Sequence, residues 1–407
     1  MKIKIYQNDR ETYFWTVDEV NQIIKSCPNF NYDIVNELKK FEYDFTINGI
    51  DITVVRKFND YTNLEDYNFI KGINIFVFSD DILSMVTKKF IQQLIDLGSE
   101  YQFIIVNKNV EDYWIHMESI YDDSFIRHIS NAGNIKVIWD AGLGNYKNFF
   151  FEPKVHIQNY YNNGHFSSTV FLNGNDAFLQ SKKDKRIGIH FNKLQDRVRV
   201  FISEKLKDYP HDKLFLTINK YCEFNEKHLN LRIGNYESDM FNPKIMGHPL
   251  GPNFYVEQFL TMTIKSEMEV VYETFTTSSE LHSCVKWNEK TIKHLFLGKP
   301  FIHMDPVAHK LMDINGFLPY RSLYSDELWE TYENTDVNVL LKKNSLLSSP
   351  SYWYEKLLNN IHWLLDMDET KWRERINEAN RIGEINRKKS HDLIFNTSLL
   401  KYVDYTI

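Results

Sequence analysis

The chain has 407 residues, which is more than one ordinary hydrophobic core holds, so two domains are expected. Hydrophobic residues make up 43% of the chain and charged residues 25%, as in soluble globular proteins. The net charge of −7 argues against a protein devoted entirely to nucleic acid, although a local basic face is compatible with it.

The three cysteines, Cys27, Cys222 and Cys284, are too few and too scattered for a disulfide framework or a zinc site. The N-terminus reads as a first strand rather than a signal peptide, and no apolar run approaches the length of a membrane span. These features predict a cytoplasmic protein without membrane contact, and we expect a monomer.

Short apolar runs with the length of buried strands alternate with amphipathic segments in the first part of the chain. The predicted strands are 3–6, 52–55, 74–78, 102–106, 134–139 and 154–157, and the predicted helices are 17–26 and 82–97. This rhythm indicates a parallel sheet with crossover connections. No Gly-x-Gly-x-x-Gly follows the first strand, so nothing supports a dinucleotide site.

Turn-forming residues dominate 159–184, where we place the linker between a domain of residues 1–175 and a second domain of residues 176–370. The strand and helix alternation then restarts. Strands are predicted at 186–191, 213–218, 268–272 and 299–302, and helices at 197–206, 288–297, 352–365 and 370–389. The pattern predicts a second α/β unit, followed by a C-terminal helical segment of residues 371–407.

The stretch 268–317 holds the strongest functional signal. Glu273 lies just past the end of a predicted strand, where ligands bind in open α/β sheets. Asn288 is a suitable N-cap, which puts Glu289 and Lys290 in the first turn of a helix, where amides favour an anion. A carboxylate there can accept hydrogen bonds from a ribose diol, and an ammonium can neutralise a phosphate. The alternative is that Glu289 and Lys290 are surface charges at the helix start that bind no ligand. A lysine in the first turn, however, interacts unfavourably with the helix dipole.

This stretch resembles the donor-site region of fucosyltransferase-like glycosyltransferases, and more closely that of the glycosyltransferases encoded by tailed phages and giant viruses. The matching segments are Glu273-Thr274, Asn288-Glu289-Lys290-Thr291, Gly298-Lys299-Pro300-Phe301, and Leu311 to Gly316-Phe317. Asn288 stands where the family has threonine, a change that keeps the cap. The match is close within 268–317 and loose beyond it.

The resemblance implies a GT-B architecture, in which two Rossmann-like domains with parallel sheets face each other across a cleft and the last helix crosses back to the first domain. It also implies a nucleotide-diphosphate sugar as donor, with no cofactor. Asn192 and Arg199 hold the places of the family's asparagine and basic residue, although the segment between them lacks the usual proline and histidine. A guanidinium at a strand-to-helix turn suits a diphosphate; the alternative is that Arg197 and Arg199 lie on a solvated helix face. The expected donor site is therefore Asn192, Arg199, Glu273, Glu289 and Lys290, with Glu273 alternatively a structural carboxylate.

An inverting transferase needs a general base near the acceptor hydroxyl. Asp140 follows a predicted buried strand and precedes the small-residue loop 141–144, so we predict that it is this base. Asp80 and His165 are alternatives, and a retaining mechanism needs no base. The acceptor is a glycan or, if the source is a phage, a hydroxymethylated pyrimidine in duplex DNA that is flipped into the cleft. A viral source would place the protein in the host cytoplasm.

Two further possibilities remain open. His303, Asp305 and His309 could suggest a metal, but their spacing fits no familiar site, and none is expected. The competing function is a non-catalytic nucleotide- or glycan-binding module, because a fold can keep binding after catalysis is lost.

Overall fold

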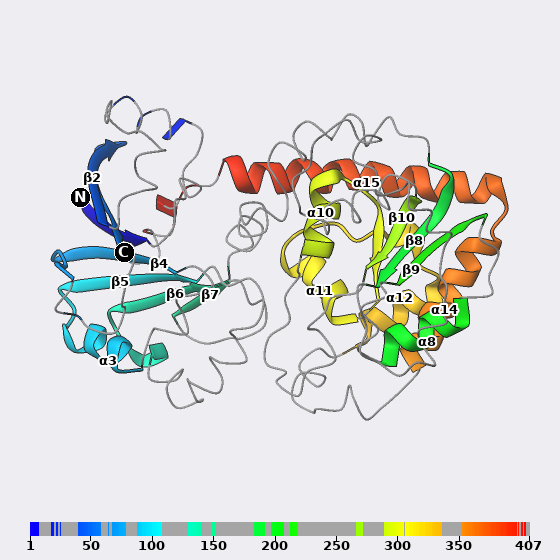
Figure 1. Cartoon of the computed structure of the whole chain (residues 1–407), viewed down its shortest axis with the longest axis horizontal. Coiled ribbons are helices and arrows are strands. Elements are labelled where there is room, and N and C mark those ends of the chain that lie inside the picture. The colour runs from blue at the N-terminus through cyan, green and yellow to red at the C-terminus, as the bar shows by residue number, and fades with distance from the viewer. Residues whose placement is uncertain are drawn as a thin grey trace. The chain divides into compact units, whose positions relative to one another are not determined.

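Two mainly parallel β-sheets lie at the centres of two units in the computed structural model of the chain (Figure 1). The first unit comprises Met1–Asn159 and His391–Ile407, and the second comprises Tyr160–Ser390. The structure describes residues 1–7, 18, 19, 22, 25, 40–57, 64, 67–78, 88–107, 129–139, 148–151, 183–191, 197–206, 212–218, 266–271, 289–304, 306–335, 352–396, 398, 400, 401 and 403.

The first unit contains a seven-stranded sheet in the order β2-β3-β1-β4-β5-β6-β7, parallel except where β2 meets β3. Its elements are β1 (Lys2–Gln7), β2 (Lys40–Ile47), β3 (Ile50–Lys57), β4 (Gly72–Phe78), α3 (Lys88–Asp96), β5 (Tyr101–Asn107), β6 (Ile135–Trp139) and β7 (Phe149–Phe151). Alternate residues of the strands are buried in an apolar core, as in Ile3, Ile5 and Ile75. Val403, from the C-terminal residues, packs into the same core.

The β2–β3 hairpin was not predicted. Its two-residue loop is Asn48-Gly49, with φ of 52° and 78°, and Ile47 pairs with Ile50 across it. Two successive residues with positive φ give the turn whose twist matches that of the flanking strands, and Asn-Gly is its most favoured sequence. The signal was therefore present in the sequence.

The second unit contains a four-stranded parallel sheet in the order β11-β10-β8-β9. Its strands are β8 (Lys185–Phe191), β9 (Leu214–Ile218), β10 (Ser266–Val271) and β11 (Phe301–His303). Its helices are α8 (Arg197–Leu206), α10 (Glu289–Leu297), α11 (Pro306–Ile314), the 3₁₀ helix η3 (Arg321–Leu323), α12 (Asp326–Glu333), α14 (Tyr352–Asp366) and α15 (Glu369–Phe395).

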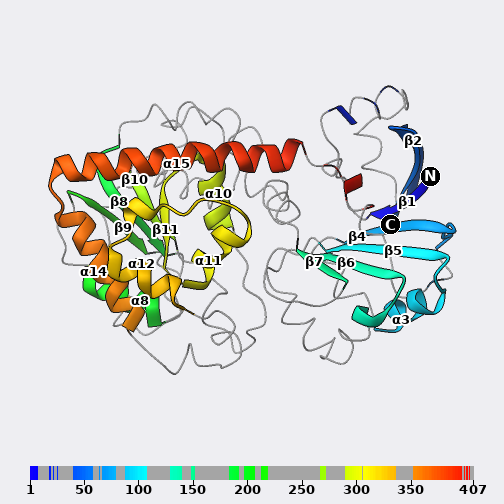
Figure 2. The same cartoon turned by 180° about the vertical axis from the view of Figure 1, so that it is seen from behind.

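Helix α15 packs against the carboxyl end of α10 (Figures 1 and 2). The Ser390 hydroxyl donates to the carbonyl of Leu295 at 3.2 Å. Gly383 and Gly298 bring the two backbones together, because a Cβ built on Gly383 would clash with the Gly298 carbonyl oxygen. Gly298 has φ of +65° and ends α10, as the sequence predicts. The carboxyl end of α10 therefore lies between the sheet and α15.

The predicted fold class is confirmed: the chain is α/β, with two mainly parallel sheets and C-terminal helices. The predicted strand at 154–157, most of the helix at 17–26 and the linker at 175/176 lie outside the described residues. None of the helices in the described part of the chain is long and apolar enough to cross a membrane.

Candidate site at the carboxyl edge of the second sheet

The sheet of the second unit has a topological switch point between β8 and β10. These strands are neighbours, but the connection after β8 leads to β9 on one side and the connection after β10 leads to β11 on the other. In open α/β sheets, such a point leaves a crevice outside the carboxyl ends of the two strands, where ligands bind. α8 follows β8 and α10 follows β10, so each of these helices begins at that edge.

Side-chain contacts fix the direction of α10. Thr291, in its first turn, lies 2.9 Å (Oγ1 to Nε2) from His303, the last residue of β11. At the opposite edge Lys299, just past the end of α10, donates to the hydroxyl of Ser266 at 3.0 Å, and Ser266 is the first residue of β10. The first turn of α10, with Glu289 and Lys290, therefore stands at the carboxyl edge. Lys290 is only 8% exposed.

The other predicted donor residues follow the same two strands. Arg199 lies in the first turn of α8. Asn192 comes directly after β8, and Glu273 comes two residues after the end of β10, but both lie outside the described residues. Asp140 comes directly after β6 in the first unit and also lies outside them. The roles of all these residues stay predictions.

Helix α10 is buried on both of its faces. The predicted apolar face of Ile292, Leu295 and Phe296 is buried, and so is the polar side of the helix. Its buried polar residues are Lys290, Thr291, Lys293 and His294. β10 meets Lys293 and His294 on the polar side, and α15 covers the carboxyl end of the helix; the sequence pattern of α10 alone reveals neither contact.

Three basic side chains surround the buried carboxylate of Glu269, in the middle of β10. Its oxygens lie 3.5 Å from Lys293 Nζ, 2.9 Å from His294 Nε2 and 3.8 Å from Lys299 Nζ. Burial alone would raise the pKa of Glu269, but Lys293, His294 and Lys299 outweigh burial and hold this pKa well below its usual value. Burial lowers the pKa of Lys299 to about 7. This Glu269 cluster ties α10 to β10. We did not predict it, although the glutamate between Met268 and Val270 in an otherwise apolar run was its signal.

A second buried network reaches from the end of β11 to the surface. The backbone amide of His303 donates to the Tyr324 hydroxyl at 3.4 Å, and the Tyr332 hydroxyl donates to the His303 carbonyl at 3.0 Å. The Tyr324 hydroxyl lies 3.1 Å from His309 Nδ1, and His309 Nε2 lies 3.4 Å from Glu333 Oε1. Burial lowers the pKa of His303 well below its usual value and that of His309 to about 4. Both rings are therefore neutral at pH 7.

We expect acid to destabilise the second unit before carboxylates titrate. A histidine with a lowered folded-state pKa contributes stability that is complete above its ordinary pKa of 6.5 and is lost as the pH falls towards the folded value. For His309, with a pKa of about 4, the free energy of unfolding should fall by about 2 kcal/mol between about pH 7.5 and about pH 5. Urea unfolding followed by tryptophan fluorescence measures this. His309→Gln, which does not titrate, should show a smaller decrease, and an equal decrease would contradict the assignment.

The His303, Asp305 and His309 group shows no metal-site geometry in the described residues. His303 Nε2 faces Thr291, while the His309 nitrogens face Tyr324 and Glu333. Asp305 lies outside the described residues. In the ranges that the structure describes, no three His, Cys, Asp or Glu side chains are arranged to hold a metal ion.

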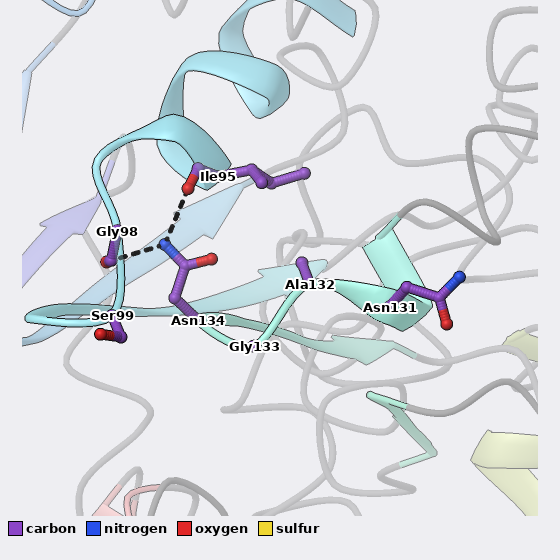
Figure 3. A pocket seen from close by; sticks show the side chains of 7 residues that line it. All are labelled: Ile95, Gly98, Ser99, Asn131, Ala132, Gly133 and Asn134. Carbon is purple, nitrogen blue, oxygen red and sulfur yellow. Dashed lines mark hydrogen bonds between the residues drawn. The ribbon is translucent and has the colours of Figure 1, made fainter.

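A cavity of about 330 Å³ lies in the first unit, at the amino edge of β5 and β6 (Figure 3). It is lined by Ile95, Gly98, Ser99, Asn131, Ala132, Gly133 and Asn134. The Asn134 amide donates to the carbonyls of Ile95 at 3.4 Å and Gly98 at 3.1 Å, and no lining side chain is charged. The predicted base Asp140 follows the other end of β6, so this cavity is not the predicted acceptor site.

No family model matches the chain, and no curated protein matches it. Among solved structures, the crystal structure of an alpha,alpha-trehalose-phosphate synthase (UDP-forming) from Burkholderia xenovorans, in complex with glucose-6-phosphate, is similar in fold. The similarity covers 99% of this chain and 100% of that one, with 8% sequence identity and a TM-score of 0.35. A likeness this distant assigns neither a site residue nor a substrate to this chain.

Proposed function

We propose that the chain is a glycosyltransferase that transfers a sugar from a nucleotide-diphosphate sugar to a hydroxyl acceptor. The proposal is supported above all by the topology of the second sheet, whose switch point lies between the strands that precede Asn192 and Glu273. The helices that follow these strands begin with Arg197 and Glu289 at the same edge. The donor residues are Asn192, Arg199, Glu273, Glu289 and Lys290.

Transfer in this proposal depends on charge stabilisation. The acceptor oxygen forms a bond with the anomeric carbon, and the bond from that carbon to the phosphate oxygen breaks, so the leaving nucleoside diphosphate gains negative charge. Lys290, Arg199 and the first-turn amides of α10 stabilise that charge. In an inverting reaction, Asp140 accepts the proton of the acceptor hydroxyl.

The acceptor is a glycan or a hydroxymethylated pyrimidine in duplex DNA. Retention of the protein on duplex DNA separates the two, because binding to a phosphate backbone weakens steeply as salt rises. Steep salt-dependent retention favours DNA, and no retention at low salt favours a glycan.

Thermal unfolding against a panel of nucleotide sugars and nucleoside diphosphates tests the proposed function. A ligand present at about 100 times its Kd stabilises the folded state by about 2.7 kcal/mol, so the correct nucleotide should raise the melting temperature by several degrees. Stabilisation followed by sugar transfer supports a glycosyltransferase. Stabilisation without transfer or hydrolysis supports a non-catalytic binding module, and no stabilisation by any nucleotide contradicts the proposal.

A further inference from the structure

The end of β11 and the first turn of α10 are joined by the contact between His303 Nε2 and Thr291 Oγ1, at 2.9 Å. We infer that His303 is a positioning residue that, through Thr291, fixes the direction in which the first turn of α10 presents Lys290 and its backbone amides to the diphosphate. The inference rests on the proposed function and extends it to two residues with no role in the donor site predicted from the sequence.

His303 is itself held rigidly. Its side chain is 1% exposed, and its ring lies edge-on to Phe301, with centroids 5.0 Å apart and planes at 83°. The hydroxyls of Tyr324 and Tyr332 hold its backbone amide and carbonyl. Thr291 is fully buried at 0% exposure. A fixed side chain on the sheet therefore meets a fixed side chain on the helix.

The contact between Thr291 and His303 lies in the turn that is proposed to bind the diphosphate. Thr291 is the third residue of α10, directly after Lys290, and the end turns of a helix fray unless they are held. Its amides have no partners within the helix and so can bind an anion, provided that they point at it. Small displacements of a binding group weaken such interactions strongly. A hydrogen bond from the sheet to this turn therefore controls the donor site without touching the donor.

The environment of His303 keeps the contact unchanged at physiological pH. Burial holds the pKa of His303 well below its usual value, with the nearby His309 and His294 acting in the same direction. Thr291 from α10 and Phe301 from β11 contact its ring, and Tyr324 and Tyr332 contact its backbone. The ring therefore stays neutral, and the geometry of the first turn does not depend on its protonation.

Two substitutions at Thr291 separate positioning from packing. Thr291→Val keeps the shape of the side chain and removes the hydroxyl, whereas Thr291→Ser keeps the hydroxyl. Isothermal titration with UDP, GDP, ADP, CDP and dTDP, each in turn, measures diphosphate binding. Thr291→Val should raise the Kd of the nucleotide that binds the unaltered protein about tenfold, because the first turn of α10 is no longer held in the direction in which its amides and Lys290 meet the diphosphate. Thr291→Ser should change it less than about twofold.

The substitution of His303 gives a second, independent arm. His303→Gln retains a polar side chain that can form a hydrogen bond with Thr291, whereas His303→Leu does not. The Kd of the nucleotide should therefore rise more in His303→Leu than in His303→Gln. Melting temperatures of all four variants show how far each remains folded. Failure of the unaltered protein to bind any diphosphate would contradict the proposed function. If it binds one, but Thr291→Val binds equally well despite a lower melting temperature, the proposed function stands and the role of His303 is only structural.

Discussion

Replacing Lys290 with alanine is expected to lower the rate of sugar transfer at least about 100-fold, the usual effect of removing one group that stabilises developing charge. Lys290 is 8% exposed in the first turn of α10, at the carboxyl edge of the sheet. An ammonium opposes the helix dipole in that position unless an anion compensates it, and the leaving diphosphate is such an anion. Steady-state kinetics with the donor identified by thermal unfolding measures the change.

Two comparisons separate lost chemistry from lost folding. Lys290→Met keeps most of the volume of the side chain without its charge and should be as inactive as Lys290→Ala. Lys388→Met removes the charge of an exposed lysine on α15 and should leave transfer unchanged. Transfer by Lys290→Met within about threefold of the unaltered protein would argue against a role for the Lys290 charge.

Glu269→Gln is expected to lower the free energy of unfolding of the second unit by about 3–5 kcal/mol, which is typical when one partner of a buried ion pair is removed. The carboxylate lies among Lys293, His294 and Lys299, and all four side chains are at most 6% exposed. Glutamine has nearly the same size, so the loss reflects uncompensated positive charge rather than a cavity. Chemical denaturation measures it.

Glu330→Gln, an exposed substitution on α12, should change the free energy of unfolding by no more than about 0.5 kcal/mol. Adding Lys299→Met to Glu269→Gln should recover part of the loss, because it removes one of the cations that the carboxylate compensates. A loss in Glu269→Gln as small as that in Glu330→Gln would show that the Glu269 cluster does not hold α10 in place.

Most of the parallel strands could be predicted from the sequence because they are continuous apolar runs, whereas β2 and β7 were not predicted. The runs at 74–78, 102–106 and 186–191 correspond closely to β4, β5 and β8. The start of α10 was also predictable, since Asn288 precedes it and Gly298 ends it. These local signals were sufficient to put Glu289 and Lys290 in the first turn of a helix.

The surroundings of α10 could not be predicted in the same way. The residues that cover its carboxyl end come from α15, almost a hundred positions later in the chain, as in the contact of Ser390 with Leu295. Lys293 and His294 look like a solvated helix face in the sequence, and only the packing of α10 against β10 shows that they meet Glu269. The contact of Thr291 with His303 likewise needs the crossover from α10 to β11. The helical periodicity of the sequence predicts one buried face of α10, whereas burial of the opposite face results from tertiary packing.

The most direct measurement is a crystal structure of the protein with the nucleoside diphosphate that stabilises it most. We expect the diphosphate at the carboxyl edge of the second sheet, with a phosphate oxygen within hydrogen-bonding distance of the first-turn amides of α10 and of Lys290. A nucleotide bound elsewhere, for example in the cavity beside Asn134, with the start of α10 empty, would contradict it.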